Sequence, residues 1–447
     1  MRRISIEYNR LVPPFNEQAC KLRLQNKPLW LHMRDIFSQY VESDMEYPDW
    51  ELAAQHERDI TEEAIVHRDN IYINEDLLEE FIREGRKRGK PVQLAFDAND
   101  PAIREHVLPL STMLKREGDL VLAEMWYLPK GFSQISETGT LIIDTEARER
   151  GYYHIPPFAA SLYGDLVYQL PKKAFVVIES WVHVFIADIL FGIFTYGVNI
   201  EDNISISWRQ KAKILWQAVL QQKPILSAAE LVQIGENSSI HPTAQITGPA
   251  IIGNNVTIGA GAVIDACIIG DNVTVSQGAQ LHISVVGDGC FLPFRAALFM
   301  TTLMENTMVA QNTCLQLCVV GRDTFIGAGT TFTDTSVLMA PLRGMNGHDQ
   351  LEELNLRVIG GCVGHHCHLG SGLVIYPARM IESDVILIPN EKRMYIRKNV
   401  YFEDSDHHHL NMNDEYGHTQ LYPRQQTRFG QSLEDSRRNL EKILNQK

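Results

Sequence analysis

The chain has 447 residues, and because single hydrophobic cores stop growing near about 250–300 residues, we expect more than one domain. Hydrophobic residues make up 45% and charged residues 21%, as in an ordinary globular protein, and the net charge of −14 argues against a general nucleic-acid-binding protein. The seven cysteines lack a paired CxxC spacing and are typical of reduced core residues, which predicts a cytoplasmic protein.

Residues 1–170 are expected to form a mixed α/β domain. Strand-like apolar runs, such as residues 92–96 and 120–128, alternate with segments of helical periodicity. The clearest helix spans residues 74–90, with acidic residues in its first turn and basic residues in its last, an order that suits the helix dipole.

Residues 171–231 are predicted to be a helical connector. The run 174–200 is the most apolar in the chain and is long enough to span a membrane. It also carries Glu179, His183 and Asp188, which are costly in lipid, and the next charged residues are acidic. Two interpretations follow: a buried helix, or membrane contact through 174–200. An amphipathic helix is predicted at 207–222.

Residues 232–390 show a six-residue period. A branched apolar residue returns at each sixth position from Ile234 to Ile264, and the same period resumes from Val363 to Leu387. Six fits neither a helix nor a simple strand, so each hexapeptide is interpreted as one short strand and a turn, with three to a coil. The sequence therefore predicts a β-solenoid, interrupted by a loop at 341–357 that could reach a neighbouring coil. Residues 391–447 read as a polar arm with a short helix at 432–447.

The repeats "IIGNNVTIGAGAVI" (251–264) and "IIGDNVTV" (268–275) resemble the hexapeptide-repeat transferase family. The resemblance implies a left-handed parallel β-helix, association as a homotrimer, and acyl transfer.

Two earlier stretches, "NKPLWLHMRDIF" (26–37) and "HRDNIYI" (67–73), resemble sugar-phosphate nucleotidyltransferases. The resemblance implies that Lys27 lies near a sugar nucleotide and that Asp69 helps to hold Mg²⁺, although Asp69 also reads as a plain turn residue. That family opens with a glycine-rich phosphate loop, and residues 1–25 contain no glycine. We therefore expect a degenerate nucleotidyltransferase-like domain.

The segment "VGHHCHLGSG" (363–372) is the densest group of histidines within the repeats. Its Gly364-His365 and Leu369-Gly370 resemble the catalytic segment of the bifunctional N-acetylglucosamine-1-phosphate uridyltransferase and glucosamine-1-phosphate acetyltransferase family. On that resemblance His365 is the general base, the group that acyl transfer requires. The alternative is an outward-facing histidine that merely meets solvent. His348, in the 341–357 loop, is the second candidate.

Metal binding is a rival use of the same segment. His366 and His368 would share one face of a strand and could meet at one metal ion. A metal ion here would make the chain resemble the γ-class carbonic anhydrases, which are also left-handed β-helices, although their three zinc ligands come from different coils with other spacing.

The function that the resemblance implies is acyl transfer from acetyl-CoA or another acyl-CoA to a sugar or sugar nucleotide. Two alternatives stay open. One is a non-catalytic oligomeric assembly protein whose transferase sites have decayed, and the other is a sugar-phosphate nucleotidyltransferase.

Overall fold

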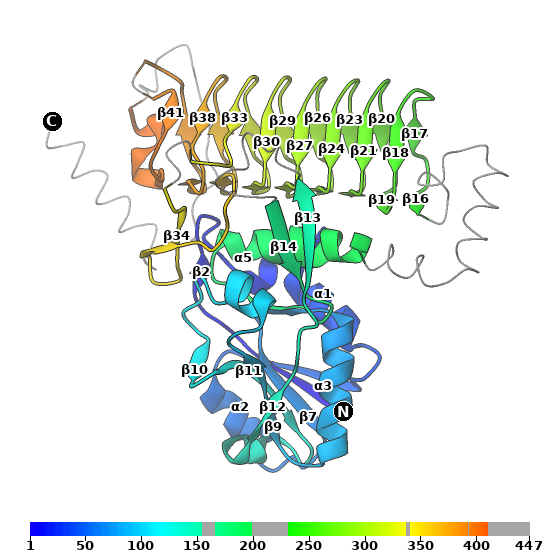
Figure 1. The fold of residues 1–447 in the computed structure, drawn as a ribbon, viewed down its shortest axis with the longest axis vertical. Helices are drawn as coiled ribbons and strands as arrows, with labels where there is room; N and C mark the ends of the chain where they lie inside the picture. Colours follow the sequence, from blue (N-terminus) through cyan, green and yellow to red (C-terminus); the bar gives the residue numbers. More distant parts are fainter. Residues whose placement is uncertain (154–165, 199–230, 337–339, 392, 410–447) are drawn as a thin grey trace, which may run out of the picture. The chain divides into compact units, whose positions relative to one another are not determined.

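The computed structural model describes residues 1–153, 166–198, 231–336, 340–391 and 393–409. The chain divides into two compact units, each discontinuous in sequence. The first contains residues 1–10, 18–211 and 341–357, and the second contains residues 11–17, 212–340 and 358–447. Figure 1 shows the described residues coloured along the sequence, from blue at the N-terminus to orange near residue 409.

The first unit contains a mixed sheet with the order β12-β9-β11-β7-β1-β6. Strand β1, next to the edge strand β6, is parallel to both β6 and β7, whereas β11 is antiparallel to both β7 and β9. The strands are β1 (Arg2–Ile6), β6 (Ser43–Tyr47), β7 (Ala64–Arg68), β9 (Val92–Asp97), β11 (Leu120–Leu128) and β12 (Gly139–Ile142), with β10 (Lys115–Glu117) paired to β11. Short pairs are formed by β4 (Arg23–Leu24) with β5 (Lys27–Pro28) and by β13 (Arg148–Tyr153) with β14 (Leu166–Leu170).

The same unit contains helices α1 (Leu29–Phe37), α2 (Trp50–Glu57) and α3 (Glu75–Arg88) beside this sheet (Figure 1). The predicted α/β class is thus confirmed. The predicted helix at 74–90 is α3. It begins where the Asn74 side chain accepts the Leu77 N–H, and it ends at Gly89, whose left-handed conformation suits glycine. Leu77, Leu78, Phe81 and Ile82 are buried on its inner face.

In the apolar run at 174–200, the described residues 174–198 contain a strand followed by a helix. Residues Phe175–Val177 form β15, which pairs antiparallel with β8 (Ile71–Ile73). The helix therefore begins later than predicted, with α5 (Trp181–Phe185), where Ser180 caps the first turn, and continues as a π-helix over Ile186–Phe194. The predicted helices at 207–222 and 432–447 lie outside the described residues.

The charged residues of this run have protein partners within the first unit. The Glu179 carboxylate accepts hydrogen bonds from the Ser111 hydroxyl (2.9 Å) and the Thr112 N–H (2.8 Å). His183 Nε2 lies 2.9 Å from the Pro109 carbonyl, and Asp188 accepts the Gln25 N–H. The helix Trp181–Val198 is long and apolar enough to cross a membrane, but 83% of it is buried inside the structure. These satisfied polar groups favour the interpretation as a buried helix.

Residues 341–357 form a hairpin of the first unit, with strands β34 (Arg343–Met345) and β35 (Leu351–Glu353). Asn355 Nδ2 donates to the Arg104 carbonyl oxygen at 3.0 Å, and the apolar side chains of Leu342, Met345 and Leu354 are buried. The predicted loop of the β-helix is therefore a hairpin that packs within the first unit, because it has an apolar face of its own to bury.

The second unit is the predicted left-handed parallel β-helix, built from three eight-stranded parallel sheets (Figure 1). The first sheet contains β16 (Val232–Ile234), β19 (Ala250–Ile252), β22 (Ile268–Ile269), β25 (Val285–Val286), β28 (Thr302–Leu303), β31 (Val319–Val320), β36 (Cys362–Val363) and β39 (Met380–Ile381). The second contains β17 (Ser239–Ile240), β20 (Thr257–Ile258), β23 (Thr274–Val275), β26 (Phe291–Leu292), β29 (Met308–Val309), β32 (Phe325–Ile326), β37 (His368–Leu369) and β40 (Ile386–Leu387). The third contains β18 (Gln245–Thr247), β21 (Val263–Asp265), β24 (Gln280–His282), β27 (Ala297–Phe299), β30 (Cys314–Gln316), β33 (Thr331–Phe332), β38 (Val374–Ile375) and β41 (Tyr395–Ile396).

The six-residue period is the inward stack of this β-helix. Ile252, Ile258 and Ile264 are at most 2% exposed and belong to one continuous core. The strand register places Ile246, Ile264 and Leu281 directly above one another. Corner residues take a left-handed conformation, for which asparagine is suited, as at Asn255 and Asn272. Ile234 departs from the pattern because it lies in the terminal coil, where it is 45% exposed.

Two further segments pack on the last coils of the β-helix. Residues 11–17 lie against β39 and the turn that follows, where Ser383 N–H donates to the Pro14 carbonyl (3.0 Å) and Asn16 Nδ2 donates to Glu382 (3.0 Å). Ser405, between two short 3-10 turns (Phe402–Asp404 and Asp406–His409), accepts the Ile386 N–H at 2.8 Å. The predicted boundary between the β-helix and a polar arm at residue 390 was wrong, because Tyr395–Ile396 pair with β38 as a strand of the third sheet and Ser405 also binds the last coil.

Candidate functional site

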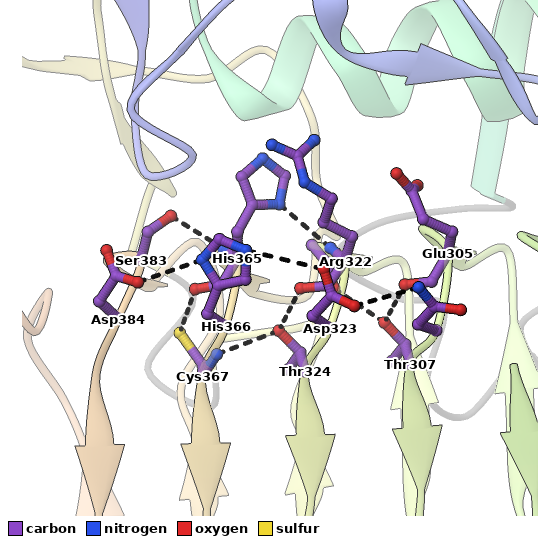
Figure 2. A network of polar contacts seen from close by, with 12 residues as sticks. Glu305, Thr307, Arg322, Asp323, Thr324, His365, His366, Cys367, Ser383 and Asp384 are labelled. Carbon is purple, nitrogen blue, oxygen red and sulfur yellow. Dashed lines mark hydrogen bonds and ion pairs between the residues drawn. The ribbon is translucent and has the colours of Figure 1, made fainter. Parts of the chain in front are cut away.

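The predicted base, His365, is buried beside residues 11–17. It follows β36, and only 2% of it is exposed. Its backbone N–H donates to Ser383 Oγ (2.8 Å), and its ring Nδ1 accepts the backbone N–H of Arg322 (3.1 Å; Figure 2). Nε2 lies 3.3 Å from Glu17 Oε2, and the Phe15 ring packs at a centroid distance of 5.1 Å. The prediction of an outward-facing, solvent-exposed histidine was wrong.

Both ring nitrogens of His365 face protein groups. Because Nδ1 accepts a hydrogen bond, the proton of the neutral ring is assigned to Nε2, toward Glu17. Glu17 also binds the Arg322 guanidinium through two contacts of 2.8 Å. Burial lowers the pKa of His365; burial alone would raise the pKa of Glu17, but hydrogen bonds from His365 and Arg322 lower it to about 2. A general base needs one nitrogen aimed at the substrate. The contacts of His365 instead indicate a structural residue that holds residues 11–17 against the last coils of the β-helix.

His366 and His368 do not share a strand face. His366 occupies a corner with φ 56°, and its Nδ1 and Nε2 lie 3.1 Å from Asp384 and 3.6 Å from Asp323. Figure 2 shows His366 in a row of corner side chains, between Asp384 and Asp323. His368 lies in β37 and is exposed. Among the residues that the structure describes, no group of three or more His, Cys, Asp or Glu side chains is placed to hold a metal ion.

The other predicted site residues lie in the first unit and are engaged there. His348, in the turn between β34 and β35, accepts from Arg10 at 2.9 Å. Lys27, in β5, forms an exposed ion pair with Asp35 at 3.0 Å.

Asp69 follows β7, and its Oδ1 accepts the Tyr8 N–H at 2.8 Å. Burial raises its pKa to about 6. This carboxylate already accepts an N–H, and among the described residues it belongs to no group of three or more His, Cys, Asp or Glu side chains placed to hold a metal ion, so these contacts do not favour a magnesium site.

An exposed carboxylate–histidine pair lies elsewhere on the β-helix, in the third sheet. The register sets Asp265 of β21 beside His282 of β24, one coil further along. Nδ1 of His282 lies 2.7 Å from Asp265 Oδ2, and the two side chains are 43% and 37% exposed. The hydroxyl of Thr247, in β18, donates to Oδ1 of the same carboxylate. On the other side, the Phe299 ring of β27 stacks on the imidazole with a centroid distance of 5.3 Å and an interplanar angle of 9°.

This pairing suits general base chemistry. Nδ1 faces a carboxylate and is assigned the proton, so the lone pair of the neutral ring lies on Nε2. No described residue contacts Nε2 through a hydrogen bond or an ion pair. Burial would raise the pKa of Asp265, but the hydrogen bonds from His282 and Thr247 outweigh it and hold this pKa below its usual value. The carboxylate is therefore ionised at neutral pH and can stabilise an imidazolium.

This pair is not recognisable as a cluster in the sequence, because Asp265 and His282 lie one coil apart and meet only across neighbouring strands. The informative signal is an Asp and a His at equivalent positions of consecutive repeats, one coil apart.

A sequence profile described as "bacterial transferase hexapeptide (six repeats)" matches residues 232–266, which include Asp265. These residues are hexapeptide repeats of the bacterial transferase type. No curated protein matches the chain.

Solved structures similar to the chain include two UDP-N-acetylglucosamine acyltransferases. The enzyme of Campylobacter jejuni is 15% identical over 36% of this chain, with a TM-score of 0.27, and the chain spans 61% of that enzyme's length. The enzyme of Francisella novicida is 15% identical over 38% of this chain and 66% of its own, with a TM-score of 0.23. A putative acetyltransferase of Bacillus cereus is 16% identical over 39% of this chain and 86% of its own, with a TM-score of 0.18. At such identities a likeness concerns the fold alone, and these TM-scores are too low to support an argument about activity.

Proposed function

We propose that the β-helix unit transfers an acyl group from an acyl-CoA to a sugar or sugar nucleotide, with His282 as the general base. The observation that supports this most directly is an exposed imidazole whose Nδ1 is bound to the Asp265 carboxylate on the surface of a hexapeptide β-helix. This arrangement combines a fixed tautomer with a ring that is 43% exposed and whose Nε2 has no partner among the described residues, whereas the ring of His365 is buried and both of its nitrogens face protein groups.

The proposed step is an addition and elimination at the thioester. As the acceptor's oxygen or nitrogen attacks the thioester carbonyl, Nε2 of His282 takes its proton, and a tetrahedral intermediate forms. The carbon–sulfur bond then breaks, the acyl group stays on the acceptor, and the departing thiolate takes the proton back from the imidazolium. Asp265 stabilises that imidazolium while it carries the charge.

The other expected functions have weaker support. Nucleotidyl transfer would use Lys27 and Asp69, but the first is paired with Asp35 and the contacts of the second do not favour a magnesium site. The role of His365 as a base stays a prediction, and the burial of its ring argues against that role. The non-catalytic assembly protein is the interpretation that remains if no transfer occurs.

The test measures transfer from acetyl-CoA to a panel of amino sugars and UDP-sugars, with free CoA and acylated product quantified by mass spectrometry. Because a general base contributes about 10²–10⁴-fold, His282→Gln should lower the turnover by a factor in that range. Asp265→Asn should also lower it, because the amide no longer stabilises the imidazolium.

The matched control is His241→Gln. His241 is an exposed histidine of the same β-helix, and among the described residues its ring forms hydrogen bonds with Thr243 alone, at 2.9 Å to the hydroxyl. Wild-type turnover in the His282→Gln protein would remove His282 from the reaction. A wild-type protein that neither transfers acetyl groups nor binds acetyl-CoA in titration calorimetry would overturn the proposed function in favour of the assembly interpretation.

A further inference from the structure

We infer that Thr247 is a positioning residue for His282, acting through Asp265 from the preceding coil. The catalytic part of this inference rests on the proposed function. The structural part, which concerns the ring tautomer of His282, does not depend on it.

The three side chains form one outward ladder on the third sheet. Parallel register pairs Thr247 with Asp265 and Asp265 with His282, so each is directly adjacent to the next across neighbouring strands. The backbone spacing of the three is therefore fixed by the β-helix itself. Phe299 continues the ladder in β27, and its ring covers the face of the imidazole on that side.

The two carboxylate oxygens of Asp265 interact with two different donors, one of which is Thr247. Its hydroxyl donates to Oδ1, which leaves Oδ2 for Nδ1 of His282. An aspartate on an exposed strand can otherwise turn about its terminal torsion, because rotation there is soft. Two hydrogen bonds from opposite neighbours hold the carboxylate in the orientation that His282 needs.

The tautomer of His282 depends on that orientation. The proton of a neutral imidazole lies on the nitrogen that finds the better acceptor, which here is Nδ1 facing Asp265. When the carboxylate turns away, the Nε2–H tautomer becomes populated. That tautomer carries a proton on the nitrogen that should accept one, so it cannot act as the base.

The experiment compares Thr247→Val, which keeps the shape and removes the hydroxyl, with Thr247→Ser, which restores the hydroxyl. Solid-state ¹⁵N NMR of the full chain labelled with [¹⁵N]histidine reports the tautomer, and the His282 signals are assigned by difference with His282→Gln. We expect Nδ1–H in the wild type, a mixture of tautomers in Thr247→Val, and Nδ1–H again in Thr247→Ser. Turnover should fall about tenfold in Thr247→Val with little change in KM, as is common for residues that orient a functional group.

Gln316→Ala is the matched control, because Gln316 lies on the same ladder in β30, beyond Phe299. It should change neither the tautomer nor the turnover. A pure Nδ1–H signal in Thr247→Val would overturn the inference, whether or not the protein transfers acyl groups. Conversely, a wild-type protein without transferase activity but with the expected tautomer shift in Thr247→Val would support the positioning role and count only against the proposed function.

Discussion

His365 and His282 show why a histidine's chemistry depends on its second ring nitrogen. Both face a carboxylate, Glu17 in one case and Asp265 in the other. In His365 the remaining nitrogen accepts the Arg322 N–H and the residue is buried, whereas the His282 side chain is 43% exposed and no described residue binds its remaining nitrogen. The sequence drew attention to the first because histidines cluster there. It could not show that residues 11–17, from the other end of the chain, cover that cluster.

The burial of His365 should make the free energy of unfolding of the β-helix decrease at acidic pH. Burial lowers the pKa of His365 below its unfolded value of about 6.5, so the unfolded chain binds more protons and stability is lost as the pH falls through 6.5. In His365→Asn, urea unfolding followed by circular dichroism should show a decline below pH 6.5 that is shallower by up to about 1.4 kcal/mol per pH unit.

At pH 7.5 the same variant should be less stable by about 1–3 kcal/mol, because buried polar partners lose their hydrogen bonds. His241→Asn is the control and should follow the wild-type curve. Parallel pH curves for His365→Asn and the wild type would mean that His365 does not stay neutral in the folded protein.

Asp69 offers a second test at the scale of one residue. Its folded pKa of about 6 lies above the ordinary value of 3.8, so its ionisation opposes folding at neutral pH, and this penalty disappears as the pH falls toward 4. Asp69→Asn, whose amide oxygen can still accept the Tyr8 N–H, should stabilise the first unit by about 1–3 kcal/mol at pH 7 and by almost nothing at pH 4. Thermal unfolding at both pH values measures this. If Mg²⁺ raised the wild-type Tm and the substitution abolished that rise, Asp69 would be a metal ligand after all.

At the scale of elements, the parts fixed by local periodicity were predictable and the parts fixed by distant partners were not. The hexapeptide period predicted which residues point into the β-helix, and the order of charged residues predicted the position of α3. Residues 175–177 looked helical because strand and helix are both apolar when buried, and only pairing with β8 makes them a strand. The hairpin at 341–357 was taken for a loop because its few apolar residues show no repeat. The Asp265–His282 pair was hidden in the same way, since its two members meet only across a coil.

The alternation within β21 gives a direct test of the coil register. Ile264 is completely buried and Val263 is 37% exposed, although they are adjacent. Ile264→Ala should lower the free energy of unfolding by about 2–5 kcal/mol, because it leaves a cavity in the stack. Val263→Ala should change it by less than about 0.5 kcal/mol. Urea unfolding measures both free energies. If Val263→Ala destabilised the protein more than Ile264→Ala, the strand register would be shifted by one residue, with Val263 on the buried face.

At the scale of the whole molecule, the resemblance to hexapeptide transferases implies a homotrimer, and the second sheet offers a surface for one. Its outward ladder becomes apolar along the β-helix, where Phe291 pairs with Met308 and Met308 with Phe325. Phe291 and Phe294 are 41% and 42% exposed. Exposed apolar patches of this kind commonly mark protein interfaces, because burying them removes apolar surface from water.

We therefore predict that the protein associates through this ladder. Size-exclusion chromatography with light scattering at micromolar concentration should give three times the 50.7 kDa mass of the chain. The double substitution Phe291→Glu and Phe294→Glu should shift the protein to monomers, because it places like charges at an apolar contact, while circular dichroism stays unchanged. Thr274→Glu, on the preceding strand of the same ladder, is the matched control and should leave the trimer intact. A wild-type monomer would refute the expected assembly. A trimer that survives the double substitution would locate the interface on another face of the molecule.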